Sequence, residues 1–174
     1  MRLLLLRHAK SDWGNADLAD IDRPLNGRGK TAAVAMARYL KENGLLPNRI
    51  LCSTAQRARE TLARQLPHMP QEAKIHVLSD LYWQSEDDYT ALIRKHGLRV
   101  QTLMVIGHNP ATEMTALGLI GTANSGALSN IEAKFPTAAL AVIDFDIADW
   151  AELQPGTGHL ERFVRPRDLK APEE

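Results

Sequence analysis

A small set of histidine and arginine side chains follows shortly after apolar runs of the sequence. They are Arg7, His8, Arg57 and His108. Histidine is a nucleophile that forms covalent intermediates, and guanidinium groups bind phosphoryl oxygens through paired hydrogen bonds. If the fold brings these side chains together, their chemistry predicts a pocket that holds a phosphoryl group.

The apolar runs have the length of buried strands, and segments with helical spacing separate them. Strands are predicted at residues 2–6, 49–52, 75–78, 102–106, 138–145 and, as an edge strand, 159–164. Helices are predicted at residues 27–43, 55–66, from 85–88 through 91–93, and from 110 to about 119. This alternation predicts an α/β fold, a three-layer α/β/α sandwich with a mostly parallel central sheet. The carboxyl ends of such strands line the ligand crevice, so we expect the reactive side chains to converge there.

Local signals indicate where the helices begin and end. Asn43 and Gly44 are typical of a helix C-terminus, and Ser53 with Thr54 can cap the helix that follows. Pro110 is suited to the first position of a helix. Each signal adjoins a predicted helix, which supports the proposed element order.

Three polar segments need a separate interpretation. Residues 85–88, Ser-Glu-Asp-Asp, resemble a capping box at a helix start. Residues 9–26 are polar and contain glycine, proline and asparagine, which predicts a long ordered loop of the kind that carries function. Residues 121–129 are also expected to form a loop.

The composition restricts the class of protein. The 174 residues predict one domain, residues 1–174, with residues 170–174 as a frayed tail. The 21 basic residues balance 21 acidic ones, so we expect no nucleic-acid partner, and any anion site must be local. No apolar run is long enough to span a membrane. The single cysteine, Cys52, fits a reducing compartment, from which we expect a cytoplasmic protein.

Three motifs resemble those of the histidine phosphatase superfamily. Residues 6–13, Leu-Arg-His-Ala-Lys-Ser-Asp-Trp, resemble its signature, residues 53–61 resemble its second motif, and residues 105–110 resemble its third. The loop 22–29, the lack of a large insertion and the closing residues 165–169 look most like compact bacterial phosphohistidine phosphatases of the SixA type. The resemblance implies a phosphoglycerate mutase-like fold without a large cap insertion.

The resemblance also implies roles for the reactive side chains. His8 would attack phosphorus as a neutral imidazole, with its second ring nitrogen held by an acceptor, most simply a backbone carbonyl. Arg7 and Arg57 would bind the equatorial oxygens, and a protonated His108 would donate a hydrogen bond to the same group. No metal or other cofactor is implied. The six histidines also lack the short paired spacings of zinc ligands.

The sequence departs from the superfamily pattern at two places. Ala9 replaces the glycine that usually follows the nucleophilic histidine, so the backbone there must accommodate a Cβ atom. The glutamate that larger relatives place after the third strand is not evident. Asp80 is the nearest candidate for a general acid, and Glu86 and Asp87 are weaker ones. A weak acid favours a phosphoramidate substrate, because a phosphorylated imidazole can leave after protonation by solvent.

Further side chains near the motifs have two interpretations each. Ser11, Lys10 and Arg23 could contact phosphate, or they could hold the long loop together. Tryptophan and tyrosine side chains in the same regions are expected to pack or to line the rim: Trp13, Tyr82 and Trp83.

Three functions remain open from the sequence. The first is a phosphatase that removes phosphate from phosphohistidine in a phosphorelay or phosphotransfer protein, such as a histidine phosphotransfer domain. The second is a phosphatase for small phosphate monoesters with the same nucleophile. The third is a phosphate-binding module that has little or no turnover. The sequence does not predict the oligomeric state.

Overall fold

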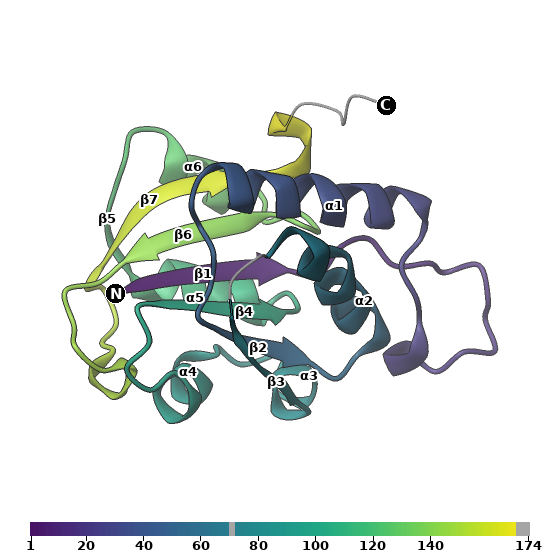
Figure 1. Ribbon diagram of the computed structural model, residues 1–174, viewed down its shortest axis with the longest axis horizontal. Helices are drawn as coiled ribbons and strands as arrows, with labels where there is room; N and C mark the ends of the chain where they lie inside the picture. The colour runs from purple at the N-terminus through teal and green to yellow at the C-terminus, as the bar shows by residue number, and fades with distance from the viewer. Residues whose placement is uncertain (70–71, 170–174) are drawn as a thin grey trace.

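The computed structural model describes residues 1–69 and 72–169, and within them seven strands form one mixed sheet with helices on both faces (Figure 1). The strands are β1 (Arg2–Arg7), β2 (Arg49–Ser53), β3 (Lys74–Leu78), β4 (Thr102–Gly107), β5 (Ile120–Ala123), β6 (Leu140–Asp144) and β7 (Gly158–Val164). The α-helices are α1 (Gly27–Glu42), α2 (Gln56–Gln65), α3 (Asp80–Trp83), α4 (Thr90–His96), α5 (Ala111–Leu119) and α6 (Ala127–Ala133). Short 3₁₀ helices are η1 (Asp20–Asp22), η2 (Leu66–His68), η3 (Trp150–Glu152) and η4 (Pro166–Asp168). The predicted α/β fold is confirmed. The expected frayed tail, residues 170–174, lies outside the described residues.

The sheet order places the strands that carry the motifs side by side. The order is β3-β2-β4-β1-β6-β7-β5. Strands β1, β2, β3 and β4 run parallel to their neighbours among themselves, whereas β6 runs antiparallel to both β1 and β7. The carboxyl ends of β1, β2 and β4 therefore lie at one edge of the sheet.

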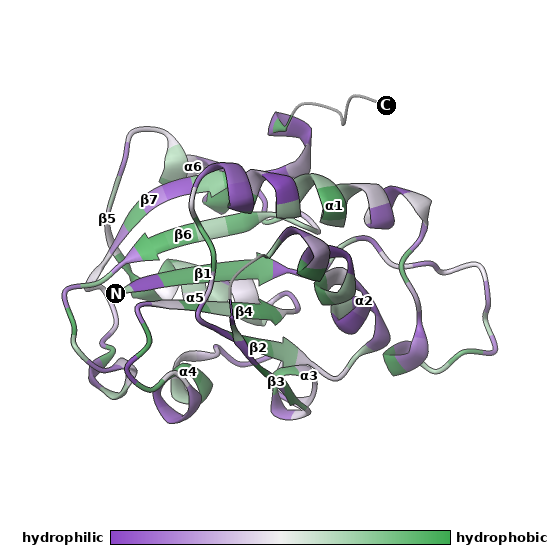
Figure 2. Ribbon diagram, in the orientation of Figure 1, coloured by the Kyte–Doolittle hydropathy of each residue, from purple (hydrophilic) through white to green (hydrophobic). Residues whose placement is uncertain are grey.

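Two apolar layers cover the sheet because successive strand residues point to opposite faces. Leu4 and Leu6 of β1 pack with buried residues of α1 and α2. Leu3 and Leu5 pack instead with buried residues of α3 to α6. Figure 2 shows apolar colour along the middle of β1, between its polar ends, and along most of β6, and a mixture of polar and apolar residues along α1. This arrangement is the predicted three-layer sandwich.

The prediction that residues 159–164 form an edge strand is wrong. β7 lies between β6 and β5, and β5 pairs with it in parallel through Thr122 and Ala123. The expected loop at residues 121–129 thus contains most of β5 and the start of α6. The physical reason is that β5 is short and contains Gly121, so its sequence has a loop-like composition, while the ladder that defines it is supplied by a distant strand.

Two predicted helix starts also differ. The acidic residues 85–88 precede α4 and do not form its first turn, and Asp88 Oδ1 accepts a hydrogen bond from Thr90 N at 2.8 Å. At α2 the N-cap is Ala55, which has no side-chain cap bond, although Ser53 Oγ accepts a bond from Ala55 N. The predicted end of α1 is confirmed, and Gly44 there has φ of +65°.

None of the helices within residues 1–69 and 72–169 combines the length and apolar character needed to cross a bilayer.

Candidate active site

The ends of three parallel strands bring two histidines and an arginine into contact. His8 follows β1, His108 follows β4, and Arg57 lies in the first turn of α2 after β2. The two imidazole rings are 5.0 Å apart between centroids. Arg57 Nε lies 3.4 Å from His8 Nε2, and Arg57 Nη2 lies 3.5 Å from His108 Nδ1. The convergence follows from β4 lying between β1 and β2 in the sheet.

A cleft of about 400 Å³ opens beside these groups, and we refer to it as the cleft. Arg7, His8, Ser11, Arg23 and Arg57 line it together with residues of the segment between α6 and β6. Arg7 Nη1 donates to Phe135 O at 2.8 Å, which fixes the guanidinium. The Nε atoms of Arg7 and Arg23 are buried and have no hydrogen-bond partner within the described residues. Unpaired buried donors are rare and costly, so they fit a site completed by an anion.

His8 is held in one tautomer by its own backbone neighbour. Its Nδ1 lies 2.7 Å from the carbonyl oxygen of Ala9, to which only a protonated Nδ1 can donate. The lone pair is then on Nε2, on the side of Arg57. Burial, the nearby His108 and the cations Arg57 and Arg7 hold the pKa of His8 well below its usual value, although the bond to Ala9 acts in the other direction. The imidazole is therefore neutral at neutral pH.

Ala9 fits its position because the backbone there does not use the left-handed conformation. Its side chain is buried among Leu25, Ala33 and Ala138, and its N–H donates to Thr61 Oγ1 at 3.0 Å. The Cβ atom thus contributes to packing at the place where the superfamily pattern has glycine.

The protonation state of His108 differs from the one expected from the sequence, which was a protonated ring. Burial and the adjacent Arg57 lower its pKa to about 4, so the free site contains a neutral ring. His108 Nε2 lies 2.7 Å from Ser53 Oγ, and Ser53 is fully buried. A guanidinium group can only donate, so Arg57 Nη2 donates to the lone pair on His108 Nδ1. We therefore assign the tautomer with hydrogen on Nε2, which donates to Ser53 Oγ.

The carboxylate that contacts this cluster is Asp20, from η1 in the long loop. Arg57 donates to Asp20 twice, from Nη1 to the backbone oxygen at 2.7 Å and from Nη2 to Oδ2 at 3.1 Å. Arg23 pairs with Oδ1 at 2.7 Å, and the Tyr82 hydroxyl donates to Oδ2 at 2.9 Å. Burial raises the pKa of Asp20, but the bonds from Tyr82 and Arg57 outweigh it and the net shift is downward. Asp20 is therefore ionised.

The sequence did not predict Asp20 as a site residue. It predicted Tyr82 only as a packing or rim residue and Ser53 only as a helix cap. The loop has four aspartates, so its composition does not distinguish Asp20 from the others. Tyr82 is brought in by α3, and its ring packs edge-on against His108 with centroids 5.7 Å apart.

Asp80, the predicted candidate for a general acid, is not brought to this cluster. It begins α3, and in the described residues it forms no hydrogen bond or ion pair with the cationic groups of the site. Its backbone oxygen accepts a hydrogen bond from Gln84 N, directly after α3, at 2.9 Å. Glu86 and Asp87 are exposed in the turn before α4. The geometry favours Asp20 as the carboxylate near a bound phosphoryl group.

The remaining predicted residues lie around the cleft. Ser11 is buried and forms an isolated bridge with Leu25, and Lys10 is exposed at the cleft wall. The Arg23 guanidinium stacks 3.2 Å above the ring centroid of Trp13, which is 74% exposed. Trp83 is also exposed and packs against Tyr82. Across residues 1–69 and 72–169, no three His, Cys, Asp or Glu side chains are grouped in a way that could hold a metal ion.

Comparison with known proteins agrees with the geometry of a phosphoryl-binding site. Residues 3–82 match the family model of the histidine phosphatase superfamily, branch 1. Rv1276c of Mycobacterium tuberculosis is 36% identical over 164 residues, which cover 93% of this chain and all of the relative. The crystal structure of SixA from Agrobacterium tumefaciens matches with a TM-score of 0.79 and 32% identity, covering 95% of this chain and 97% of that one. SixA from Nakamurella multipartitia matches with a TM-score of 0.78 and 28% identity, covering 95% of each chain.

An α/β sandwich whose strand ends present two histidines among arginines is the architecture of an enzyme that acts on phosphoryl groups. The relatives and structures above make the assignment specific: the chain belongs to the histidine phosphatase superfamily and is a phosphatase of the SixA type. The resemblance inferred from the three motifs is confirmed.

Proposed function

We propose that the chain is a metal-independent phosphohistidine phosphatase in which His8 is the nucleophile. The observation that carries this proposal is the bond between His8 Nδ1 and the Ala9 carbonyl, which leaves the Nε2 lone pair beside Arg57. A buried, neutral imidazole with a fixed tautomer is the form that attacks phosphorus. The single domain and the cytoplasmic location expected from the sequence are part of the proposal.

In the first step, a phosphoryl group enters the cleft and is bound by Arg7 and Arg57. The Nε donor of Arg7, which is unpaired within the described residues, would find an acceptor in a phosphoryl oxygen. The negative charge of the bound phosphoryl group would favour protonation of His108, whose Nδ1 would then donate a hydrogen bond to that group. The His8 Nε2 lone pair forms a bond to phosphorus while the bond from phosphorus to the leaving nitrogen breaks.

In the second step, water attacks the phosphorus of phosphorylated His8. The phosphorus–nitrogen bond to His8 breaks, inorganic phosphate leaves with the proton balance supplied by water, and the neutral imidazole is restored. The arginines remain in place and stabilise the charge on the transferred group in both steps.

The lack of a good proton donor for the leaving group, among the residues that the structure describes, supports a phosphoramidate substrate. Asp20 contacts Arg57 but is ionised, so it is a poor proton donor to an alkoxide. The imidazole of a substrate phosphohistidine can take its proton from solvent as it leaves. A phosphorylated histidine protein, such as a histidine phosphotransfer domain, is therefore the proposed partner.

The test compares kcat/KM for a phosphohistidine protein with kcat/KM for sugar and aryl phosphates, in buffer with and without a chelator. The proposal predicts a clear preference for the phosphohistidine protein and no effect of the chelator. A clear preference for monoesters would replace the proposed substrate class with small phosphate monoesters. Loss of activity in chelator, restored by a divalent metal, would contradict the metal-independent mechanism.

A further inference from the structure

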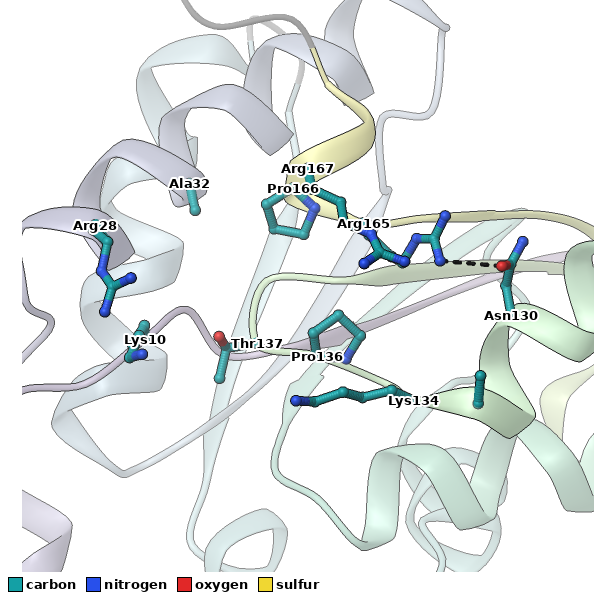
Figure 3. A pocket seen from close by; sticks show the side chains of 11 residues that line it. Lys10, Arg28, Ala32, Asn130, Lys134, Pro136, Thr137, Arg165, Pro166 and Arg167 are labelled. Carbon is teal, nitrogen blue, oxygen red and sulfur yellow. Dashed lines mark hydrogen bonds between the residues drawn. The ribbon is translucent and has the colours of Figure 1, made fainter.

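A second hollow, of about 510 Å³, adjoins the cleft and carries a concentration of positive charge. We call it the basic groove. Its cationic side chains are Lys10, Arg28, Lys134, Arg165 and Arg167. They come from four separate segments of the chain, and Figure 3 shows them placed around the hollow. Among the described residues no acidic side chain lines it, although the whole chain has a formal net charge of zero.

The basic groove is continuous with the cleft. Lys10, Lys134, Pro136 and Thr137 line both hollows. Lys10 stands two residues after His8, and the segment from Lys134 to Thr137 leads from α6 into β6. A molecule that places a phosphoryl group in the cleft therefore extends naturally into the groove.

Most of these cations lack a partner among the residues that the structure describes. Arg165 is paired with Asp168 at 2.8 Å and bonds Asn130 at 3.1 Å. The other four side chains form no ion pair or hydrogen bond within residues 1–69 and 72–169: Lys10, Arg28, Lys134 and Arg167. All four are exposed. Unpaired like charges around one hollow repel one another, and an anionic surface in the hollow would relieve that repulsion.

The groove is better suited to a protein surface than to one small anion. Its cations are long, exposed and spread over separate segments, whereas the arginines of the cleft are partly or fully buried and fixed. Between the cations lie small apolar residues, Ala32, Ala133, Pro136 and Pro166. An apolar centre with a charged rim is the usual composition of a protein interface.

A second feature at the cleft favours a protein as well. Trp13 lines the cleft and is 74% exposed, with one face against Arg23. Exposed tryptophans are enriched among the residues that contribute most to protein binding.

We propose that the basic groove docks an acidic surface of the phosphorylated protein whose phosphohistidine enters the cleft. This inference rests on the proposed function and adds to it the charge of the partner. The groove selects the partner and orients it, while Arg7, His8, Arg57 and His108 act on its phosphoryl group.

The test uses two peptides of equal length that each carry one phosphohistidine, flanked by glutamates in one and by glutamines in the other. At low salt the enzyme should turn over the acidic peptide with a kcat/KM about tenfold higher, and this preference should fall with added salt. In the variant Arg28→Glu/Arg167→Glu the preference should disappear, while turnover of an aryl phosphate stays unchanged.

A matched control makes the same change of charge outside the groove. Lys30→Glu/Arg38→Glu alters two exposed residues of α1 that do not line it, and this variant should keep the preference. Equal turnover of both peptides by the wild type, or a preference that survives Arg28→Glu/Arg167→Glu, would overturn the docking proposal. Inhibition by tripolyphosphate that depends on Arg28 and Arg167, without any preference for the acidic peptide, would overturn it in favour of a small polyanion.

A binding measurement separates this proposal from the proposed function. Fluorescence polarisation of the unphosphorylated acidic peptide reports on the groove without any chemistry. Binding that is lost in Arg28→Glu/Arg167→Glu supports docking even if neither phosphopeptide is hydrolysed, a result that would contradict the proposed function alone. Equal, weak binding of the acidic and glutamine peptides contradicts the docking.

Discussion

The cleft and the basic groove share Lys10 and Lys134 but hold their positive charges in different ways. In the cleft, Arg57 is 6% exposed, and its three nitrogens contact His8, Asp20 and His108. In the groove, the side chains of Arg28 and Arg167 are exposed and form no hydrogen bond or ion pair within the described residues. Cations fixed by several hydrogen bonds discriminate between geometries, as a transferred phosphoryl group requires, whereas exposed cations without such bonds attract charge with little regard to its exact position.

Arg57→Lys should produce the largest effect among the cleft residues other than His8. Lysine keeps the charge but loses the planar fork that contacts three partners, so kcat/KM should fall by about 10²–10³-fold. Arg59→Lys, on the same helix but exposed, should change it less than twofold. Steady-state kinetics with one phosphohistidine substrate measures both. A similar small loss in the two variants would show that the fixed guanidinium of Arg57 is not needed for binding the phosphoryl group.

The pH dependence of stability should report the burial of His108. The pKa of His108 is about 4 in the folded protein and about 6.5 when unfolded, so the unfolded state takes up a proton first as the pH falls. The stabilisation is complete above the unfolded pKa and is lost below it, by about 2 kcal/mol between pH 7.5 and 5. Urea unfolding should show a decline smaller by that amount in His108→Gln. An equal decline in both proteins would mean that His108 is not buried as a neutral ring.

Ser53→Ala should lower kcat about tenfold with little change in KM, because the Nε2 hydrogen of His108 would lose the acceptor that holds its tautomer. Nitrogen chemical shifts of the His108 ring measure the tautomer directly and should change. Thr54→Val is the control, because the buried Thr54 hydroxyl has no partner within the described residues. If Ser53→Ala lowers only thermal stability and leaves the tautomer unchanged, Ser53 has a structural role alone.

Asp20→Asn should have the smallest effect, and it should strengthen the binding of phosphate where the other variants weaken function. Asp20 competes for Arg57 in the free cleft, so removing its charge should make inorganic phosphate a stronger inhibitor by about three- to fivefold. Asp22→Asn lies in the same 3₁₀ turn without a bond to the site and should leave the inhibition constant unchanged. Weaker inhibition in Asp20→Asn would show that Asp20 supports Arg57 and does not compete with phosphate.

The fold and the reactive side chains were predictable because their signals are local. Apolar runs define β1, β2 and β4, and the motifs stand directly at their ends. The signals for β5 and Asp20 are not local. β5 is a strand only because β7 pairs with it, and Asp20 is distinguished from the other loop aspartates only by contacts with Arg57 and Tyr82.

The state of a side chain was harder to predict than its position. The sequence suggests a protonated His108, but burial beside Arg57 makes the ring neutral. The sequence also shows a balanced charge, and the fold concentrates cations by bringing residues 165–167 close to the start of α1. Both effects depend on distances between segments that are far apart along the chain.

The central claim is that phosphate passes through His8, and the direct measurement is to quench a reaction with labelled phosphohistidine peptide during turnover. The account predicts an acid-labile phosphate on the peptide that contains His8. It should be absent in His8→Ala, whose turnover should fall by at least about 10⁴-fold, and present in His68→Ala, which lies outside the cleft. Full turnover without label, label on another residue, or substantial activity in His8→Ala would contradict the account.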